Sequence, residues 1–361
     1  MIKYNSRFRL AITANSFAHG GGSERYVRDV TSGLIARGVE VTILARKIDE
    51  SLPQLEIANH KIIDTTGIPK IWRQKIFDWK LKKQLKQHPV DCIFGVNHTI
   101  HADVTACVGT HIGYLNATKK KLGIIDRRKI DYERAVYSKA KIIVAHSELM
   151  RKELENFYDV SANKIKVIYP PADPNRFKII DDAKRQELRR KLGYPKDRVI
   201  FLFVSTGHAR KGYEMLETIF SKTNLPILLA VAGRPLPRPA PNILELGYRS
   251  DIESIFQSAD YTILGSLYEP FGLVCIESIL CGTPVIVSNN VGSSEIINCN
   301  INFLFDTMNE SSLQEIIAKA YKKCVNGISR ITDPFAELEY NPSVEAHVEG
   351  LLEIFESGAA P

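Results

Sequence analysis

The segment SLYEPFGLVCIESILCGTPVIVS, residues 266–288, places two glutamates at the edges of an apolar run. A strand-like stretch, YTILGS (261–266), leads into it, and PVIVSN (284–289) lies at its end. Between these stretches the apolar positions favour a helix that begins around Phe271. A strand, a helix and a second strand in succession indicate a parallel sheet covered by helices, which is an α/β fold.

The two glutamates, Glu269 and Glu277, occupy different parts of this unit. Glu269 precedes the expected helix, whereas Glu277 lies nearly two turns inside it. The rest of the helix is apolar and should be buried, and a buried carboxylate is costly unless it has partners. Ribose hydroxyls would suit Glu277 and the hydroxyls of a sugar would suit Glu269. A buried salt bridge is the alternative for Glu277.

The same alternation extends outward over the whole chain. Strand-like runs in the first half are RLAITAN (9–15), EVTILA (40–45), DCIFGV (91–96), TACVGT (105–110), KIIVAH (141–146) and KIKVIYP (164–170). The second half restarts with VIFLFVST (199–206) and PILLAVAG (226–233). Because 361 residues exceed the roughly 250 at which one core stops growing, these two α/β halves predict two domains.

The domain boundary is expected in YPPADPNRF (169–177), whose three prolines continue neither a helix nor a strand. We predict an N-terminal domain over 1–172, a C-terminal domain over 173–340 and a terminal helix, 341–357, that packs back on the first domain. The run GRPLPRPAPN (233–242) contains four prolines in seven residues, so no crossover helix fits there. Either the next run, ILELG, is not a parallel neighbour, or a loop replaces the helix.

Composition places the chain among globular proteins, with 44% hydrophobic and 25% charged residues. The start, MIKYNSRFRLAITANSF, has no apolar core of signal-peptide length, and no apolar run approaches the ~20 residues that span a bilayer. The six cysteines form no C-x-x-C pair and mostly fall in apolar segments, as buried free thiols do. We therefore expect a cytoplasmic protein.

Charge is divided unevenly along the chain. Residues 1–170 contain 29 Lys and Arg against 17 Asp and Glu, whereas residues 171–361 contain 19 against 24. A basic first domain suggests an anionic partner, either a membrane surface or a nucleic acid. A solvated basic surface is the alternative. Two segments concentrate the charge, KIWRQKIFDWKLKKQLKQH (70–88) and TKKKLGIIDRRK (118–129).

In the first of these segments, Trp72, Ile76 and Trp79 recur at helical spacing among lysines. Tryptophan suits a membrane–water boundary because its ring is apolar and its N–H can stay hydrated. The mixture is typical of a helix that lies in a bilayer interface. An ordinary core helix with a basic outer face is the alternative.

A glycine-rich loop follows the first strand of the first half, at the sheet edge where α/β proteins bind ligands. In ANSFAHGGGSERYV the glycines are Gly20, Gly21 and Gly22, ahead of a helix expected to begin near Ser23. Consecutive glycines allow a ligand to approach the backbone, and the N–H groups of a helix start favour an anion. The loop matches a dinucleotide fingerprint poorly because Arg25 occupies the third glycine position. A plain loop with a helix cap at Ser23 is the alternative.

The corresponding loop of the second half is VSTGHARKGYEML. It places Gly207 and Gly212 on either side of two adjacent cations, Arg210 and Lys211. Such a pair beside a flexible turn could bind a diphosphate, because arginine offers a planar fork and lysine a point charge. An exposed basic turn without a ligand is the alternative.

The order of these motifs resembles a known family. A Gly-Gly loop, then R-K-G and then EPFGLVCIE match the pattern of retaining glycosyltransferases of the GT-B fold, of the family 4 type. The resemblance covers nearly the whole chain, and HARKG is most similar to the lipopolysaccharide core glucosyltransferases. It implies two Rossmann-like, doubly wound parallel-sheet domains that face each other across a cleft. The first would be the acceptor side, and the second would hold a nucleotide sugar.

The resemblance also assigns roles to individual residues. Arg210 and Lys211 would neutralise the diphosphate of the donor. Glu277 would hold its ribose and Glu269 its sugar. His111, in VGTHIGY, would lie near the reacting sugar, and a core histidine with satisfied hydrogen bonds is the alternative. The remaining donor-binding positions are Gly21, Gly22, Gly207, Phe271, Gly272 and Leu273.

The implied reaction is retaining transfer of a hexose from a nucleoside-diphosphate sugar, with UDP-hexose expected, to a cell-envelope glycan or glycolipid such as lipopolysaccharide core. No D-x-D or H-E-x-x-H motif is present, so we expect no metal and no cofactor beyond the donor substrate. The expected partners are the nucleotide sugar, the acceptor and an anionic membrane, the inner face of the cytoplasmic membrane. No nucleic acid is expected.

Two alternatives from other classes stay open. An NADP-dependent Rossmann oxidoreductase could use the glycine loop, with Arg46 and Lys47 on a 2′-phosphate, but it leaves EPFGLVCIE unexplained. A non-catalytic protein that binds nucleic acid or membrane would need only the charge of the first domain. Turnover of a sugar nucleotide distinguishes the glycosyltransferase hypothesis from both.

Overall fold

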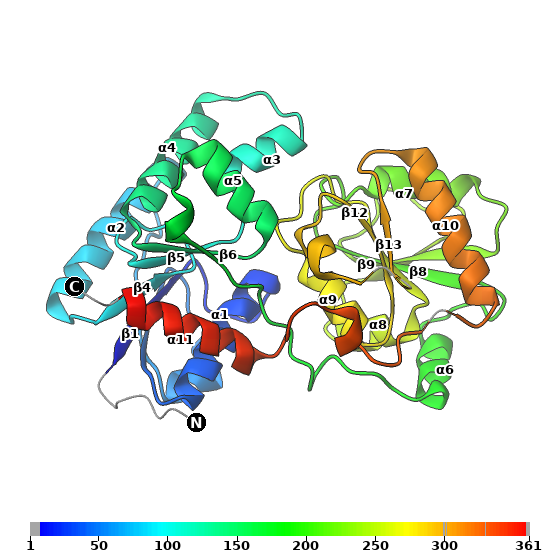
Figure 1. Ribbon diagram of the computed structural model, residues 1–361, viewed down its shortest axis with the longest axis horizontal. Coiled ribbons are helices and arrows are strands. Elements are labelled where there is room, and N and C mark those ends of the chain that lie inside the picture. The colour runs from blue at the N-terminus through cyan, green and yellow to red at the C-terminus, as the bar shows by residue number, and fades with distance from the viewer. Residues whose placement is uncertain (1–7, 299, 301, 329, 359–361) are drawn as a thin grey trace. The chain divides into compact units, whose positions relative to one another are not determined.

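The structure of the protein is a computed structural model that describes residues 8–298, 300, 302–328 and 330–358. The chain forms two compact units: unit 1 contains the chain up to Pro171 and the segment from Ser343 onward, and unit 2 contains Ala172–Pro342. Each unit is a parallel sheet with helices on its faces (Figure 1), which confirms the predicted pair of doubly wound α/β domains. None of the described helices combines the length and the hydropathy that crossing a bilayer requires.

Unit 1 has a seven-stranded sheet in the order β3-β2-β1-β4-β5-β6-β7, with parallel neighbours throughout. Its strands are β1 (Arg9–Ala14), β2 (Glu40–Ala45), β3 (Asn59–Ile62), β4 (Cys92–Gly95), β5 (Val104–Cys107), β6 (Ile142–Ala145) and β7 (Ile165–Val167). Its helices are α1 (Gly22–Ala36), α2 (Lys70–Gln87), α3 (His111–Ala117), α4 (Ile124–Lys139), α5 (Glu148–Tyr158) and α11 (Val344–Gly358).

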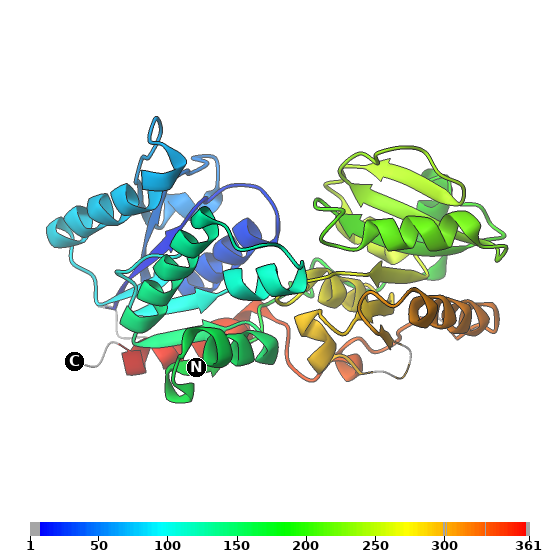
Figure 2. The same ribbon diagram turned by 90° about the horizontal axis from the view of Figure 1, so that it is seen from above.

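The sheet of unit 1 is buried on both faces because successive strand residues point to opposite sides. On β1, Leu10 and Ile12 pack into a core shared with α1 and α11, whereas Ala11 packs with Phe77 and Leu81 of α2. Figure 2 shows α2 and α11 on opposite sides of this sheet. The C-terminal helix α11 therefore completes the core of unit 1, although it follows all of unit 2 in the sequence.

Unit 2 has six parallel strands in the order β10-β9-β8-β11-β12-β13. Its strands are β8 (Val199–Ser205), β9 (Ile227–Gly233), β10 (Ile243–Gly247), β11 (Tyr261–Leu264), β12 (Val285–Ser288) and β13 (Phe303–Phe305). Its helices are α6 (Asp182–Lys191), α7 (Tyr213–Lys222), α8 (Ile252–Ser258), α9 (Leu273–Leu280) and α10 (Glu310–Val325). The run ILELG is β10, and it pairs in parallel with β9. A proline-rich loop therefore replaces the crossover helix there.

The strand order locates the candidate ligand sites. Counted within each unit, the sheet of unit 2 runs 3-2-1-4-5-6, and that of unit 1 has the same order with a seventh strand at its end. This is the doubly wound order of dinucleotide-binding folds. The order reverses between β1 and β4 in unit 1 and between β8 and β11 in unit 2. Ligands of such folds bind at these reversals, outside the carboxyl ends of the strands. The loops after β1, β8 and β11 are therefore the first places to look for a site.

A buried cluster of two histidines and a tyrosine ties α11 to the rest of unit 1. Nδ1 of His347, on α11, lies 2.8 Å from the carbonyl oxygen of Tyr169, and its Nε2 lies 3.1 Å from the hydroxyl of Tyr26. The ring of His146, which follows β6, packs edge-on against Tyr26 with centroids 4.8 Å apart. Burial lowers the pKa of His146 to about 3 and the pKa of His347 to about 4.

This cluster predicts that the protein loses stability in mild acid. An unfolded histidine takes up a proton with a pKa near 6.5, whereas burial holds the pKa of His146 at about 3 and that of His347 at about 4. The unfolded state therefore binds more protons over this interval. The free energy of unfolding should fall by roughly 1.4 kcal/mol per pH unit for each group as the pH drops from about 6.5 toward 4.

Urea unfolding at several pH values between 7 and 5 measures this slope. The substitution His347→Gln should reduce this slope by about half, because the glutamine amide does not titrate whereas His146 remains. The matched control is His88→Gln, at an exposed position, which should leave the slope unchanged. An unfolding free energy that is the same at pH 7 and at pH 5 would contradict the prediction.

Candidate active site

Three residues singled out in the sequence meet at the carboxyl edge of the unit 2 sheet. Arg210 and Lys211 lie in the loop between β8 and α7, and Glu269 lies in the loop between β11 and α9. Arg210 Nη1 is 3.0 Å from Glu269 Oε2, and Lys211 Nζ is 3.9 Å from the same oxygen. These two loops flank the reversal of strand order in unit 2.

The Arg210 guanidinium group forms hydrogen bonds within the protein through Nη1, whereas its other nitrogens form none in the described part of the chain. Its Nη1 also donates to the carbonyl oxygen of Tyr268 at 2.7 Å, whereas Nη2 and Nε have no hydrogen-bond partner among the described residues. The Arg210 side chain is 34% exposed, against 12% for Lys211 and 15% for Glu269. The outer half of the guanidinium group is therefore available to an anionic ligand, which arginine can bind through two N–H groups at once.

The backbone around Glu269 is fixed by the neighbouring loop. Glu269 forms an isolated parallel bridge with Val291. The Glu269 N–H donates to the carbonyl of Asn290 at 3.3 Å, and the Glu269 carbonyl accepts from the Gly292 N–H at 2.9 Å. The loops after β11 and β12 therefore position the carboxylate together, and a fixed carboxylate can orient the hydroxyls of a substrate.

The helices that follow the two site loops both begin at a glycine without a side-chain cap. Gly212 precedes α7 and Gly272 precedes α9, with φ values of 80° and 92°. A Cβ on Gly212 would lie 2.1 Å from the carbonyl oxygen of Gly265, so glycine is required. Elsewhere in the chain, Ser147 and Asp181 cap the starts of α5 and α6. Uncapped helix starts leave N–H groups for an anion such as a diphosphate.

The other donor-binding positions predicted in unit 2 lie around these helix starts. Phe271 and Leu273 flank Gly272 at the beginning of α9, and Gly207 lies in the loop after β8. Glu277 lies inside α9 with only 2% of its surface exposed. Within the described part of the chain, no group of three or more His, Cys, Asp or Glu side chains is placed to hold a metal ion.

In unit 1, the glycine loop leads directly into α1. Gly22 is the first residue of this helix and Gly21 is its N-cap, without a capping side-chain hydrogen bond. Ser23 therefore lies inside the helix and is not its cap. The Glu24 carboxylate lies beside the loop, because a Cβ on Gly21 would be 3.7 Å from Glu24 Oε2. A diphosphate over Gly21 and Gly22 would have to displace this carboxylate.

His111 is the first residue of α3, and its ring contacts an acid that the sequence analysis did not single out. Nε2 of His111 lies 2.8 Å from Oδ1 of Asp126, in the first turn of α4. The His111 backbone N–H donates to Glu133 at 3.0 Å. The hydrogen bond from His111 makes the largest contribution to holding the pKa of the Asp126 carboxyl below its usual range, and the hydrogen bond from the Gly123 N–H contributes next. Nδ1 of His111 has no hydrogen-bond partner among the described residues, so this ring atom can still form one.

Asp126 is expected to matter for turnover through His111. The substitution Asp126→Asn removes the charge that fixes the ring, and the loss of one charge-assisted hydrogen bond should lower kcat about tenfold or more. Steady-state kinetics with the nucleotide-sugar donor that the motifs predict measures this effect. Asp131→Asn, at an exposed position on the same helix, is the matched control. Equal kcat values for the two variants would show that Asp126 does not position His111 for the reaction.

Comparison with known proteins gives the class of the protein. The family model described as Glycosyltransferase Family 4 matches residues 20–176, and the model described as Glycosyl transferases group 1 matches residues 184–324. A probable transglycosylase of Burkholderia thailandensis is 37% identical over 354 residues, which cover 97% of this chain and 98% of the relative. The chain therefore belongs to the glycosyltransferases of the GT-B fold, with a family 4 first half and a group 1 second half.

Solved structures show the same fold at lower sequence identity. WaaG, a glycosyltransferase involved in lipopolysaccharide biosynthesis, matches with a TM-score of 0.77 and 18% identity over 97% of this chain and 98% of that chain. HepE of Anabaena, in complex with UDP-glucose, matches with a TM-score of 0.78 and 17% identity over 97% and 100%. These matches confirm the GT-B fold expected from the motifs.

Proposed function

We propose that the protein is a retaining, metal-independent hexosyltransferase. Its donor is a nucleoside-diphosphate sugar, specifically a UDP-hexose, and its acceptor is a cell-envelope glycan or glycolipid such as lipopolysaccharide core. The observation that carries the proposal is the joint placement of Arg210, Lys211 and Glu269 where the strand order of unit 2 reverses. A pair of cations beside uncapped helix starts suits a diphosphate, and a carboxylate at the same place suits sugar hydroxyls.

The proposed reaction breaks the bond between the anomeric carbon and the diphosphate oxygen, which takes the electron pair. Arg210, Lys211 and the N–H groups at the starts of α7 and α9 stabilise the charge that develops on this oxygen. The acceptor hydroxyl attacks the same face of the sugar and passes its proton to the departing phosphate, so the anomeric configuration is retained. Glu269 binds the hydroxyls of the sugar and Glu277 those of the ribose. We assign His111 to the reacting sugar, through Nδ1.

A panel of sugar nucleotides tests the proposed function. UDP-glucose is the first donor to try, because HepE was solved with it. We expect one UDP-hexose to raise the melting temperature and to be hydrolysed slowly to UDP in the absence of acceptor. No binding or turnover of any sugar nucleotide would overturn the proposal, and a nicotinamide-linked absorbance change would favour the oxidoreductase alternative instead.

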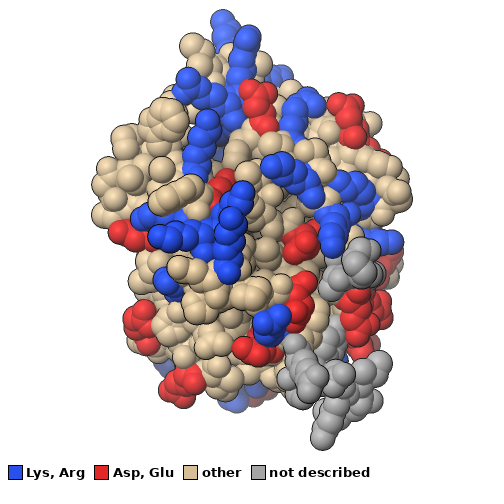
Figure 3. Space-filling model, turned by 90° about the vertical axis from the view of Figure 1, so that its left-hand side faces the viewer, with Lys and Arg blue, Asp and Glu red and all other residues tan. Residues whose placement is uncertain are grey.

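The outer face of α2 supports the proposed contact with an anionic membrane. This helix packs on the sheet through Phe77 and Leu81, whereas Trp72 and Trp79 are 54% and 63% exposed. At helical spacing the two tryptophans share a stripe with exposed lysines, namely Lys75, Lys82, Lys83 and Lys86. Figure 3 shows that Lys and Arg are abundant on the face of the molecule that includes α2. The two tryptophans therefore add exposed apolar surface to the basic outer face of α2.

The segment that joins α3 to α4, together with the first turns of α4, also combines exposed apolar and basic residues. Leu122, Ile124 and Ile125 are 50%, 76% and 69% exposed. Exposed basic residues precede and follow them at 119–121 and 127–129. We propose that both segments contact anionic headgroups on the inner face of the cytoplasmic membrane, with the protein in the cytoplasm. Each basic residue near such a surface contributes about 1 kcal/mol.

Sedimentation with lipid vesicles tests the membrane contact. The protein should bind vesicles that contain an anionic phospholipid at low salt, bind them less at high salt and bind neutral vesicles weakly. Reversing the charge of Lys82, Lys83 and Lys86 to Glu should weaken binding about tenfold or more. The control reverses three exposed lysines of unit 2, Lys184, Lys222 and Lys319. The membrane contact is excluded if the protein stays in the supernatant with anionic vesicles at low salt, or if both triple variants lose binding equally.

A further inference from the structure

A basic cavity lies at the amino-terminal edge of the unit 2 sheet, where β8 and β11 begin. Its volume is about 400 Å³. Five cationic side chains line it: Arg185, Arg189, Arg190, Lys196 and Arg198. The acidic side chains of the lining are Asp197 and Asp260. The wall of the cavity therefore has an excess of positive charge.

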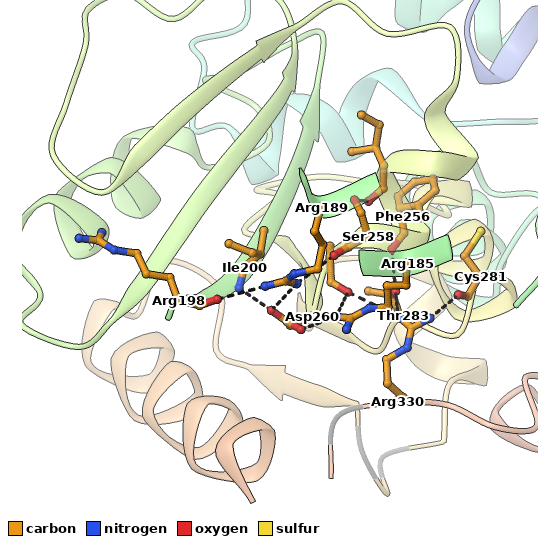
Figure 4. Close-up of polar contacts among 12 residues, drawn as sticks. Arg185, Arg189, Arg198, Ile200, Phe256, Ser258, Asp260, Cys281, Thr283 and Arg330 are labelled. Atoms are coloured by element: carbon orange, nitrogen blue, oxygen red, sulfur yellow. Dashed lines mark hydrogen bonds and ion pairs between the residues drawn. The ribbon is translucent and has the colours of Figure 1, made fainter. Parts of the chain in front are cut away.

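One buried carboxylate accepts hydrogen bonds from two buried guanidinium groups in this wall. Asp260 accepts from Arg185 Nη2 at 2.5 Å and from Arg189 Nη1 at 3.1 Å. Its Oδ2 also accepts from the backbone N–H of Ile200 at 2.7 Å. Figure 4 shows both guanidinium groups pointing at Asp260, between the start of β8 and α6. The carboxylate accepts three hydrogen bonds, and its single negative charge faces two guanidinium groups.

The buried part of this cluster is not fully satisfied by the protein itself. Arg185 is 9% exposed, and its Nε is buried without a hydrogen-bond partner among the described residues. Arg330 donates to Thr283 Oγ1 at 2.5 Å on the other side of the cluster. Burial, and then the like charge of Arg185, lowers the pKa of Arg330 to about 10. Three guanidinium groups therefore lie close to a single carboxylate.

The remaining cations have room for a ligand. Arg190 and Lys196 are exposed and form no ion pair within the described part of the chain. Tyr194 contributes a flat aromatic wall, with Arg189 Cζ 5.8 Å from its ring centroid. A concave site lined by charges of one sign concentrates counter-ions. Converging cations with few acidic partners favour an anionic ligand.

We infer that this cavity is a second anion site, which binds a small phosphate-bearing molecule. A phosphate group presents several oxygens that arginine can bind with fixed geometry and lysine with a point charge. The cavity volume suits a small molecule. The cavity lies at the amino ends of β8 and β11, whereas Arg210, Lys211 and Glu269 follow the carboxyl ends of the same strands. A ligand here would leave the donor loops free, and the inference does not depend on the proposed function.

Calorimetric titration with pyrophosphate, at constant ionic strength in chloride, tests this inference. The wild-type protein should show two classes of site, one in the cavity and one at the Arg210 loop. The double variant Arg190→Glu/Lys196→Glu should weaken one class about tenfold or more, because it reverses two charges that no protein group pairs. It should leave binding of UDP-glucose unchanged. The double variant Arg210→Ala/Lys211→Ala should weaken only the other class.

The matched control is Lys184→Glu/Lys191→Glu, which makes the same change of charge on α6 outside the cavity lining. It should retain both classes. The inference is overturned if the control loses as much affinity as the cavity variant, or if the cavity variant binds pyrophosphate like the wild type. If the Arg210/Lys211 variant alone has no effect, the proposed donor site fails while the cavity site stands.

Discussion

Alanine in place of Arg210 or of Lys211 is expected to lower turnover of the sugar donor about 10²–10³-fold, the scale for removing one preorganised electrostatic stabiliser. Both cations lie at the strand-order reversal of unit 2, within 3.0 and 3.9 Å of Glu269. Arg210 keeps Nη2 and Nε free of partners among the described residues, so its loss removes donors that only a ligand would use. The measurement is kcat for donor hydrolysis or transfer at saturating donor.

The fold should survive these changes. The Arg210 side chain is partly exposed and its ion pair with Glu269 is accessible to water, and such pairs contribute little to stability. Arg238→Ala is the matched control, because Arg238 also pairs with a glutamate of unit 2, Glu217, but is 76% exposed and lies in the loop between β9 and β10. The diphosphate role is wrong if both variants turn over the donor at the wild-type rate.

The second large effect concerns Glu269 and Glu277, whose substitution should weaken the binding of different ligands. Glu277→Gln should weaken binding of free UDP about 10–100-fold, because it removes the carboxylate that we propose accepts from the ribose hydroxyls. Glu269→Gln should spare free UDP and weaken the intact sugar nucleotide by a similar factor. We expect different effects because the two carboxylates occupy different positions. Glu269 lies in the loop before α9, whereas Glu277 is buried inside that helix. Calorimetry with UDP and with the UDP-sugar measures both affinities.

Glutamine is the first choice at Glu277 because the site is 2% exposed and alanine would leave a cavity. Glu277→Ala serves as the second variant, and its melting temperature reports whether Glu277 acts mainly as a structural partner. If both glutamine variants lose the same affinity for both ligands, the assignment of ribose to Glu277 and sugar to Glu269 is incorrect. Unfolding of Glu277→Ala with normal binding by Glu277→Gln would instead support a buried salt bridge.

Much of the fold could be predicted because most strands are short, apolar and separated by helix-period segments. Two strands, β3 and β13, were not predicted from this pattern. The sequence of β3, NHKI, is exposed at the sheet edge, so it carries no apolar pattern, and β13 is only three residues long. The proline-rich loop before β10 excluded a helix, but only the pairing with β9 decides that β10 is a parallel neighbour.

The candidate site was predictable as a set of loops but not as a set of contacts. The motif order placed Arg210, Lys211 and Glu269 after strand ends, whereas the ion pair between Arg210 and Glu269 joins residues 59 positions apart. Asp126 follows Gly123 by three positions, which is a signal for a helix start. No local pattern connects it with His111, because that contact depends on how α3 and α4 pack.

The anomeric configuration of the first product tests the central claim most directly. The donor to use is the UDP-α-hexose that binds in the panel, and proton NMR can follow the sugar or glycoside released before mutarotation. The account predicts that the first product is the α anomer, that it forms in the presence of a metal chelator, and that Arg210→Ala and Lys211→Ala form it far more slowly. A first product with the β configuration would contradict retaining transfer, and product formation that needs an added metal ion would contradict the role given to Arg210 and Lys211.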